Sequence, residues 1–230
     1  MQSSQALSIN TGPKFQLLDG LAPGERELVL ASAVRRRFAA GAVVSEQGML
    51  GDCLYLLVKG CARCFYTTAD GTKILLIWMG SGDAFGGAAI LATPTTYRVS
   101  VEAVKDCEAL VWDRATFRGF TERFPQLFDN ALMIALSYLD WYVMAHVALS
   151  CHTARERLAR VLLSLAEAVG EKVPGGIEID VTNEDLASAA NITPYTTSRL
   201  MSGWQKSRTL TKRRGKVVLR SPERLALKVV

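Results

Sequence analysis

The sequence predicts an α+β protein with a β-rich first part, a long central helix and a small mixed unit at its C-terminal end. Glycines separate short apolar runs between about residues 15 and 123, which is typical of many short strands. Residues 126–169 contain neither glycine nor proline, which favours long helices. From residue 181 onward, signals for two short helices precede signals for a β-hairpin.

The composition is that of a folded chain that is not secreted. Of 230 residues, 49% are hydrophobic and 21% are charged, so the chain can form a packed core in one large or two modest domains. The first sixteen residues lack a basic segment followed by an apolar one, so a secretion signal is not supported. Five cysteines at irregular spacing indicate reduced thiols. We therefore expect a cytoplasmic protein.

Three segments of the first part have the composition of strands. They read CLYLLV at 53–58, ARCFYTT at 62–68 and KILLIWM at 73–79. Between the last two, Asp70-Gly71 is the signal of a tight hairpin turn. Short strands at this spacing predict a barrel or sandwich, flanked by helices.

An apolar stripe marks the central helix. It repeats at alternating spacings of four and three residues, through Leu132, Leu136, Leu139, Val143 and His146. A membrane span over 131–151 is the alternative, but Asp140 at mid-span would cost about 2.5–3.5 kcal/mol. Serines and tyrosines weaken that alternative further. The pattern favours a helix buried between two copies of the chain, and thus a homodimer without a membrane anchor.

Residues 181–204 predict two helices joined by a tight turn. Thr182 and Asp185 are spaced as a capping box at the start of the first helix. Asn191 falls at the turn, where a left-handed backbone is needed, and Thr193-Pro194 suits the start of the second helix. Four residues are expected to pack the helices together: Leu186, Ala190, Ile192 and Leu200. This is the helix-turn-helix pattern, in which the second helix enters the DNA major groove.

The segment after the second helix is basic and has the pattern of a hairpin. Residues 210–219 read as strand, basic turn and strand, like the wing of a winged helix-turn-helix. Residues 191–230 contain ten Lys and Arg against Glu223 alone, a net charge of +9, whereas the first 190 residues carry 17 − 21 = −4. A basic end on a slightly acidic body indicates a polyanion partner.

Further motifs follow one another in a recognisable order. The first part contains GxxGDxLYLLVxG at 48–60, DG at 70–71, GDxFG at 82–86 and VEA at 101–103. The last part contains RLA at 157–159, VTNEDLA at 181–187 and SRxxSxW at 198–204. Over about residues 15–225, the chain resembles Crp/Fnr-type transcription regulators.

The resemblance implies a fold and a function. The fold would be a β-roll of the jelly-roll type at 1–123, resembling cyclic-nucleotide-binding domains, a dimerisation helix at 124–153 and a winged helix-turn-helix at 154–230. The function would be that of a dimeric regulator that binds a palindromic double-stranded DNA operator and contacts RNA polymerase. A regulatory module of a kinase or channel, and an enzyme, are the alternatives. The wing argues against the first, and the lack of a catalytic motif argues against the second.

The predicted DNA contacts lie on the second helix and the wing. The residues at the start of such a helix read base edges, so we assign that role to Tyr195, Thr196, Ser198 and Arg199. We assign mainly phosphate contacts to Thr193, Lys206, Arg213 and Lys216.

The predicted effector pocket departs from the cyclic-AMP pattern of the family. Gly87 stands where the resemblance implies a ribose-binding Glu, and Tyr97 stands where it implies a phosphate-binding Arg. Arg98 comes one residue late, which in a strand would turn it to the other face. Cyclic AMP is therefore not expected, and the alternative is binding of cyclic AMP or cyclic GMP through Arg98. The candidate pocket residues are Phe85, Gly86, Gly87, Ala88, Tyr97, Arg98, Tyr142 and Val143.

Redox and metal cofactors are also not expected. An iron–sulfur cluster of the Fnr kind needs N-terminal cysteines, and residues 1–52 contain none. Cys61 and Cys64, three apart on a strand, would face opposite sides and chelate poorly. Haem needs an axial ligand, and the two histidines, His146 and His152, lie on or after the central helix. What remains is an unidentified effector, a redox signal, or none.

Overall fold

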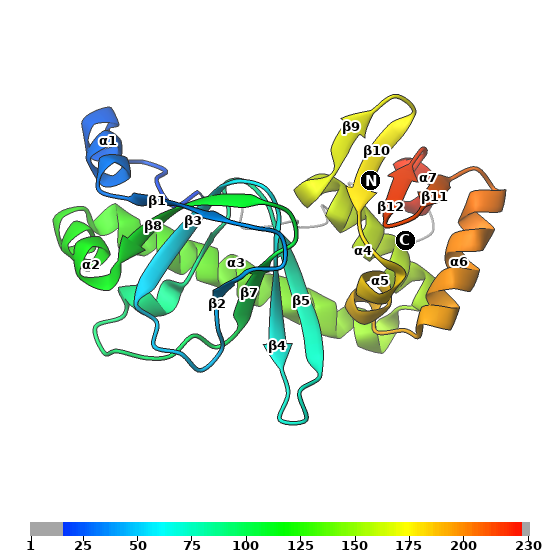
Figure 1. Ribbon diagram of the computed structural model, residues 1–230, viewed down its shortest axis with the longest axis horizontal. Coiled ribbons are helices and arrows are strands. Elements are labelled where there is room, and N and C mark those ends of the chain that lie inside the picture. Colours follow the sequence, from blue (N-terminus) through cyan, green and yellow to red (C-terminus); the bar gives the residue numbers. More distant parts are fainter. Residues whose placement is uncertain (1–15, 227–230) are drawn as a thin grey trace, which may run out of the picture. The chain divides into compact units, whose positions relative to one another are not determined.

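The computed structural model describes residues 16–226, which divide into two compact units (Figure 1). The described part of the first unit, residues 16–143, is rich in strands, and residues 144–226 form the second unit. The predicted α+β class, with a β-roll, a long helix and a C-terminal helix-turn-helix with a wing, is confirmed.

Two four-stranded antiparallel sheets form the roll. One has the order β1-β8-β3-β6 and the other β2-β7-β4-β5. The strand bounds are β1 Val34–Phe38, β2 Val43–Ser45, β3 Cys53–Lys59, β4 Ala62–Thr67, β5 Lys73–Met79, β6 Ala84–Phe85, β7 Ser100–Ala103 and β8 Cys107–Asp113. The helices of this unit are α1 Pro23–Ala31, the 3₁₀ turn η1 Gly87–Ile90, α2 Arg114–Arg123 and α3 Pro125–Cys151, which continues into the second unit.

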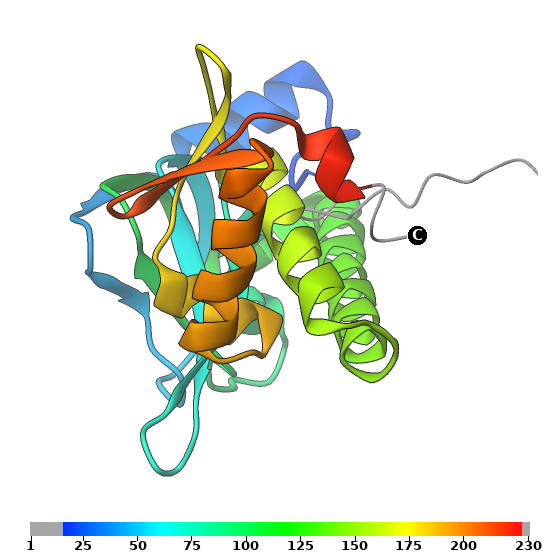
Figure 2. The same cartoon turned by 90° about the vertical axis from the view of Figure 1, so that its right-hand side faces the viewer.

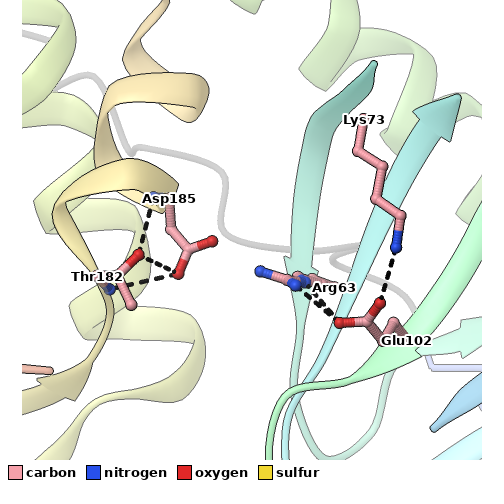
Figure 3. A network of polar contacts seen from close by, with 5 residues as sticks. All are labelled: Arg63, Lys73, Glu102, Thr182 and Asp185. Carbon is pink, nitrogen blue, oxygen red and sulfur yellow. Dashed lines mark hydrogen bonds and ion pairs between the residues drawn. The ribbon is translucent and has the colours of Figure 1, made fainter. Parts of the chain in front are cut away.

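The expected hairpin joins β4 and β5. The Gly71 amide donates to the Thr68 carbonyl at 2.9 Å, and Gly71 has a φ of +83°, which glycine adopts without a steric penalty. On the neighbouring strand β7, Glu102 is buried and accepts from Arg63 at 2.7 Å and from Lys73 at 3.2 Å (Figure 3). A buried carboxylate with two cationic partners ties three strands of this sheet together.

One face of α3 packs on the roll. Leu127 and Ile134 are buried there, and the Asn130 amide donates to the carbonyl oxygens of Leu17 and Asp19 at 3.0 and 2.8 Å. The Tyr138 hydroxyl donates to the Ala84 carbonyl at 3.2 Å. On the opposite face, the expected stripe is exposed, with Leu132 51% and Leu139 55% accessible. By length and composition alone α3 could cross a membrane, but this packing ties one face to protein.

The second unit has the predicted capped helices. Its elements are α4 Ala154–Val169, β9 Glu171–Val173, β10 Gly176–Asp180, α5 Asn183–Ala190, α6 Pro194–Lys206, β11 Leu210–Arg213, β12 Lys216–Leu219 and α7 Pro222–Ala226. The four strands form one sheet in the order β11-β12-β10-β9. The capping box of α5 is present, because the Thr182 hydroxyl accepts from the Asp185 amide at 3.1 Å and the Thr182 amide donates to the Asp185 carboxylate at 3.3 Å (Figure 3).

The turn between α5 and α6 is also as predicted. Asn191 has a φ of 49° in the left-handed region, and Thr193 caps α6 with Pro194 at its first position. Arg157 of α4 fixes this turn, because its guanidinium donates to the carbonyl oxygens of Ala190 at 2.8 Å and Asn191 at 3.2 Å. Those carbonyls have no helical partner of their own, so the arginine satisfies the end of α5.

We predict that Thr182→Ala loosens α5 without unfolding the protein. Loss of the cap should cost about 1 kcal/mol, so amide hydrogen exchange across 183–190 should become about fivefold faster. Ser188→Ala, at an exposed position inside α5, is the matched control and should leave exchange unchanged. Equal exchange in both variants would show that the capping box does not stabilise the helix.

Candidate DNA-binding surface and effector cavity

The outer face of α6 presents the polar residues that the sequence assigned to base reading. Tyr195 is 76% exposed, Ser198 and Arg199 are exposed and Thr196 is half-buried. Tyr195 and Arg199 are one helical turn apart and therefore share a face. Lys206 is exposed at the end of the helix. Thr193 is exposed too, but its hydroxyl already accepts from the Thr196 amide at 3.1 Å.

The inner face of α6 fixes which residues point outward. Thr197, Met201 and Trp204 are buried at helical spacing. Leu200, which the sequence analysis expected to pack the two helices together, is half-buried, whereas its neighbour Met201 is fully buried. The Arg155 guanidinium of α4 lies 5.3 Å from the centre of the Trp204 ring, a cation–π contact that adds to this packing.

The predicted wing is the β11–β12 hairpin (Figure 2). Arg213 and Arg214 are exposed at its tip, beside Gly215 with a φ of +69°. Lys216 is different, because its ammonium pairs with the Glu178 carboxylate and lies 3.4 Å from an oxygen of Asp180. The hydrogen bond to Glu178 and the charge of Asp180 raise the pKa of Lys216. Two carboxylates therefore lie beside the ammonium of Lys216, whereas no ion pair of Arg213 is found within residues 16–226. Arg214 is a tip residue that the sequence assignment left out.

A cavity of about 460 Å³ lies in the first unit, between the roll and the face of α3 that packs on it. Seven of the eight predicted pocket residues line it: Phe85, Gly86, Gly87, Ala88, Tyr97, Arg98 and Tyr142. Val143 does not, because its place on α3 turns it to the exposed stripe. The sequence assignment left out four lining residues of α3, at a helical spacing that could have identified them: Ala131, Ile134, Ala135 and Tyr138.

The expectation that Arg98 faces away from the pocket is wrong, because Tyr97 and Arg98 both line the cavity. Arg98 and Val99 form a bend between Tyr97 and β7 instead of a strand, so the alternation of a strand does not apply here. Tyr97 is buried, and its hydroxyl donates to the Cys53 carbonyl at 2.8 Å and accepts from the Cys53 amide at 2.9 Å. Arg98 lines the cavity but is exposed to solvent.

The tyrosine hydroxyls and the thiol of the cavity wall are neutral at pH 7. Burial raises the pKa of the Tyr142 hydroxyl and that of the Cys64 thiol, each to about 12. Burial also raises the pKa of Tyr138 well above its usual value. Asp83, near Tyr138, has a pKa raised by burial to about 6 and accepts from the Gly80 amide at 2.7 Å.

The five cysteines are free thiols. Cys64 lines the cavity, whereas the buried Cys61 accepts at its carbonyl a hydrogen bond from the Cys107 thiol at 3.0 Å. Cys61 and Cys64 are therefore both buried, but their side chains lie in different surroundings. Within residues 16–226, no three His, Cys, Asp or Glu side chains gather so as to hold a metal ion.

Comparison with protein families matches both parts of the chain. A model described as "Cyclic nucleotide-binding domain" matches residues 35–124, and a "Crp-like helix-turn-helix domain" matches residues 156–227. The "Cyclic AMP receptor protein" of Thermus thermophilus is 30% identical over 185 residues, which are 80% of this chain and 83% of that protein. The "Nitrogen fixation regulation protein FixK" of Azorhizobium caulinodans is 24% identical over 80% of this chain and 74% of its own length.

Solved structures share the fold. FixK2 from Bradyrhizobium japonicum superimposes with a TM-score of 0.72 at 21% identity, over 84% of this chain and 95% of that one. The c-di-GMP-responsive global regulator CLP of Xanthomonas campestris gives a TM-score of 0.73 at 20% identity, over 86% and 99% of the two chains.

Proposed function

Because the chain belongs to the Crp/Fnr family of transcription regulators, we propose that it is a homodimer that reads a palindromic operator and responds to an effector other than cyclic AMP. The exposed polar face of α6, with a basic wing beside it, is the observation that carries the DNA-binding part. In this proposal the chain has three functional parts: a sensor domain at 1–123, a dimerisation helix at 124–153 and a winged helix-turn-helix at 154–230. The protein would act in the cytoplasm, with RNA polymerase as a partner.

The exposed stripe of α3 supports the dimer. Leu132, Leu136, Leu139 and Val143 are each between 44% and 55% accessible on one face of the helix. A contiguous apolar face of this kind marks an interaction surface. A second copy of α3 would cover it with the same residues, as a two-fold interface requires.

The polar face of α6 and the wing divide the DNA contacts. Tyr195, Thr196, Ser198 and Arg199 would meet base edges, and Arg199 can make a bidentate contact to guanine. Thr193, Lys206 and Arg213 would meet phosphates. Lys216 would contribute less to phosphate binding, because its ammonium already pairs with Glu178 and Asp180.

The wall of the cavity supports an effector other than cyclic AMP. A bound phosphate needs a charge partner, and the position implied for it is occupied by Tyr97, which is committed to Cys53. The name of the Thermus thermophilus relative nevertheless makes cyclic AMP the ligand to test first. If cyclic AMP does bind, the solvent-exposed Arg98 is the residue that would contact its phosphate.

The dimer is tested by Leu139→Glu. The wild type should sediment as a species of about 50 kDa, twice the 25.1 kDa of one chain. The variant places a charge in the apolar stripe and should give monomers or aggregates. Leu28→Glu, the same substitution at an exposed site on α1, is the control and should stay dimeric. A wild-type monomer that binds DNA tightly would contradict the proposal.

Base reading is tested by selecting bound sequences from a random DNA pool. Arg199→Ala should cost about 1–3 kcal/mol and relax the preference at one base pair in each half-site, with half-sites about 10–10.5 bp apart. Arg213→Ala should weaken binding to all sequences and lower the salt slope by about one unit per subunit. Lys216→Ala should change that slope less. An unchanged motif for Arg199→Ala would mean that another residue reads the base.

Cyclic AMP is tested by calorimetric titration, and no saturable heat is expected up to millimolar nucleotide. Operator affinity should be equal with and without it. The variant Arg98→Ala identifies the alternative: if the wild type binds cyclic AMP or cyclic GMP and the variant does not, Arg98 supplies the phosphate contact and the exclusion is wrong.

A further inference from the structure

The cavity of the first unit is lined almost without charge. Its wall consists mostly of apolar side chains, among them Ile77, Met79, Phe85 and Ile134. No Asp, Glu, Lys or His is among the described residues that line it, and its one charged side chain belongs to the exposed Arg98. Asp83, which influences Tyr138 from outside this lining, is held by the Gly80 amide.

Several polar groups of the wall make no hydrogen bond within residues 16–226: the hydroxyl of Tyr142 on α3, the thiol of Cys64, and the hydroxyls of Ser45, Thr95 and Thr96. The other two tyrosines differ, because the Tyr97 hydroxyl is bonded to Cys53 and the Tyr138 hydroxyl donates to Ala84. Tyr142 and Cys64 remain uncharged at neutral pH. The cavity therefore offers neutral donors in a mostly apolar setting, and the Tyr142 hydroxyl is the one that α3 contributes.

Such a wall selects ligands by charge. An anion loses its hydration on entering an apolar cavity, and without a cation inside it recovers little of that loss. An apolar molecule has no such hydration to lose, and its transfer from water into the cavity is favourable. One hydrogen-bond acceptor on that molecule would satisfy the hydroxyl of Tyr142, which an entirely apolar ligand would leave unpaired.

We propose that this cavity binds an uncharged, largely apolar small molecule that accepts a hydrogen bond from Tyr142. The inference rests on the proposed function, because it takes the cavity to be the effector site, and it names the chemical class of that effector. The size of the cavity, about 460 Å³, is in the range of ordinary small-molecule pockets.

A matched pair of fluorescent probes tests the charge. The neutral ketone is 6-propionyl-2-dimethylaminonaphthalene, and its anionic counterpart is 6-dimethylamino-2-naphthoate, with a carboxylate in place of the ketone. Titrated into the full-length protein, the ketone should bind once per chain with a blue-shifted emission. The carboxylate should bind at least tenfold more weakly. Equal or tighter binding of the carboxylate, especially if Arg98→Gln abolishes it, would overturn the proposal in favour of an anionic ligand.

Two pairs of variants place the probe. Ile134→Trp fills the cavity and should abolish ketone binding, whereas Ile74→Trp, at an exposed site on β5, should not. Tyr142→Phe should weaken the ketone about fivefold and shift its emission further to the blue, since a donor is lost. Tyr66→Phe, exposed on β4, should change neither. Ketone binding that Tyr142→Phe leaves unaltered in affinity and emission would overturn the assignment, even if Ile134→Trp fails to fold.

Operator binding, measured on the same samples, separates this inference from the proposed function. A protein that binds its operator but not the ketone would refute the ligand class and leave the regulator intact. A protein that binds the ketone in the cavity but no DNA would refute the regulator and leave the cavity's chemistry standing.

Discussion

The packing of α3 on the β-roll is the constraint on which the rest of the first unit depends. Asn130 holds the start of the helix to the carbonyls of Leu17 and Asp19, and Tyr138 holds its middle to Ala84. These bonds set the rotation of the helix about its own axis. Once that rotation is set, Tyr142, one helical turn after Tyr138, shares its face and lines the cavity, whereas Leu136, two residues before Tyr138, lies on roughly the opposite side of the helix and is exposed. The cavity and the apolar stripe are thus two consequences of one contact.

The sequence was most informative where structure is decided by neighbouring residues. The capping box of Thr182 and Asp185, the left-handed Asn191 and the Asp70-Gly71 hairpin all depend on bonds within a few residues, and all were predicted correctly. The same holds for the strands, whose apolar runs and turns are local patterns. The side chains of the DNA-binding surface and of the cavity were harder to predict, because their positions depend on contacts between segments that are distant in the sequence.

Two residues illustrate that limit. Lys216 is a basic residue of the wing, and the sequence therefore predicted that it contacts phosphate. In the structure β10 lies beside β12 and brings Glu178 and Asp180 to its ammonium. That pairing comes from a register across some forty residues, which no local pattern displays. Leu200 fits a helical packing pattern as well as Met201 does, and only the contact of α6 with its neighbours decides that Met201 is the buried one.

The chemistry of the cavity follows from how Tyr97 is satisfied. A tyrosine in place of a buried cation needs partners for its hydroxyl, and Cys53 provides both a carbonyl and an amide. The bonds serve the backbone as well, since β3 begins at Cys53. Replacing Tyr97 with arginine would leave these backbone groups without their partner and would bury a charge that only an anionic ligand could offset. The residue that would close the cavity to phosphate is therefore part of the sheet's own hydrogen bonding, so the proposed preference for neutral ligands would depend on the same bonds that stabilise the roll.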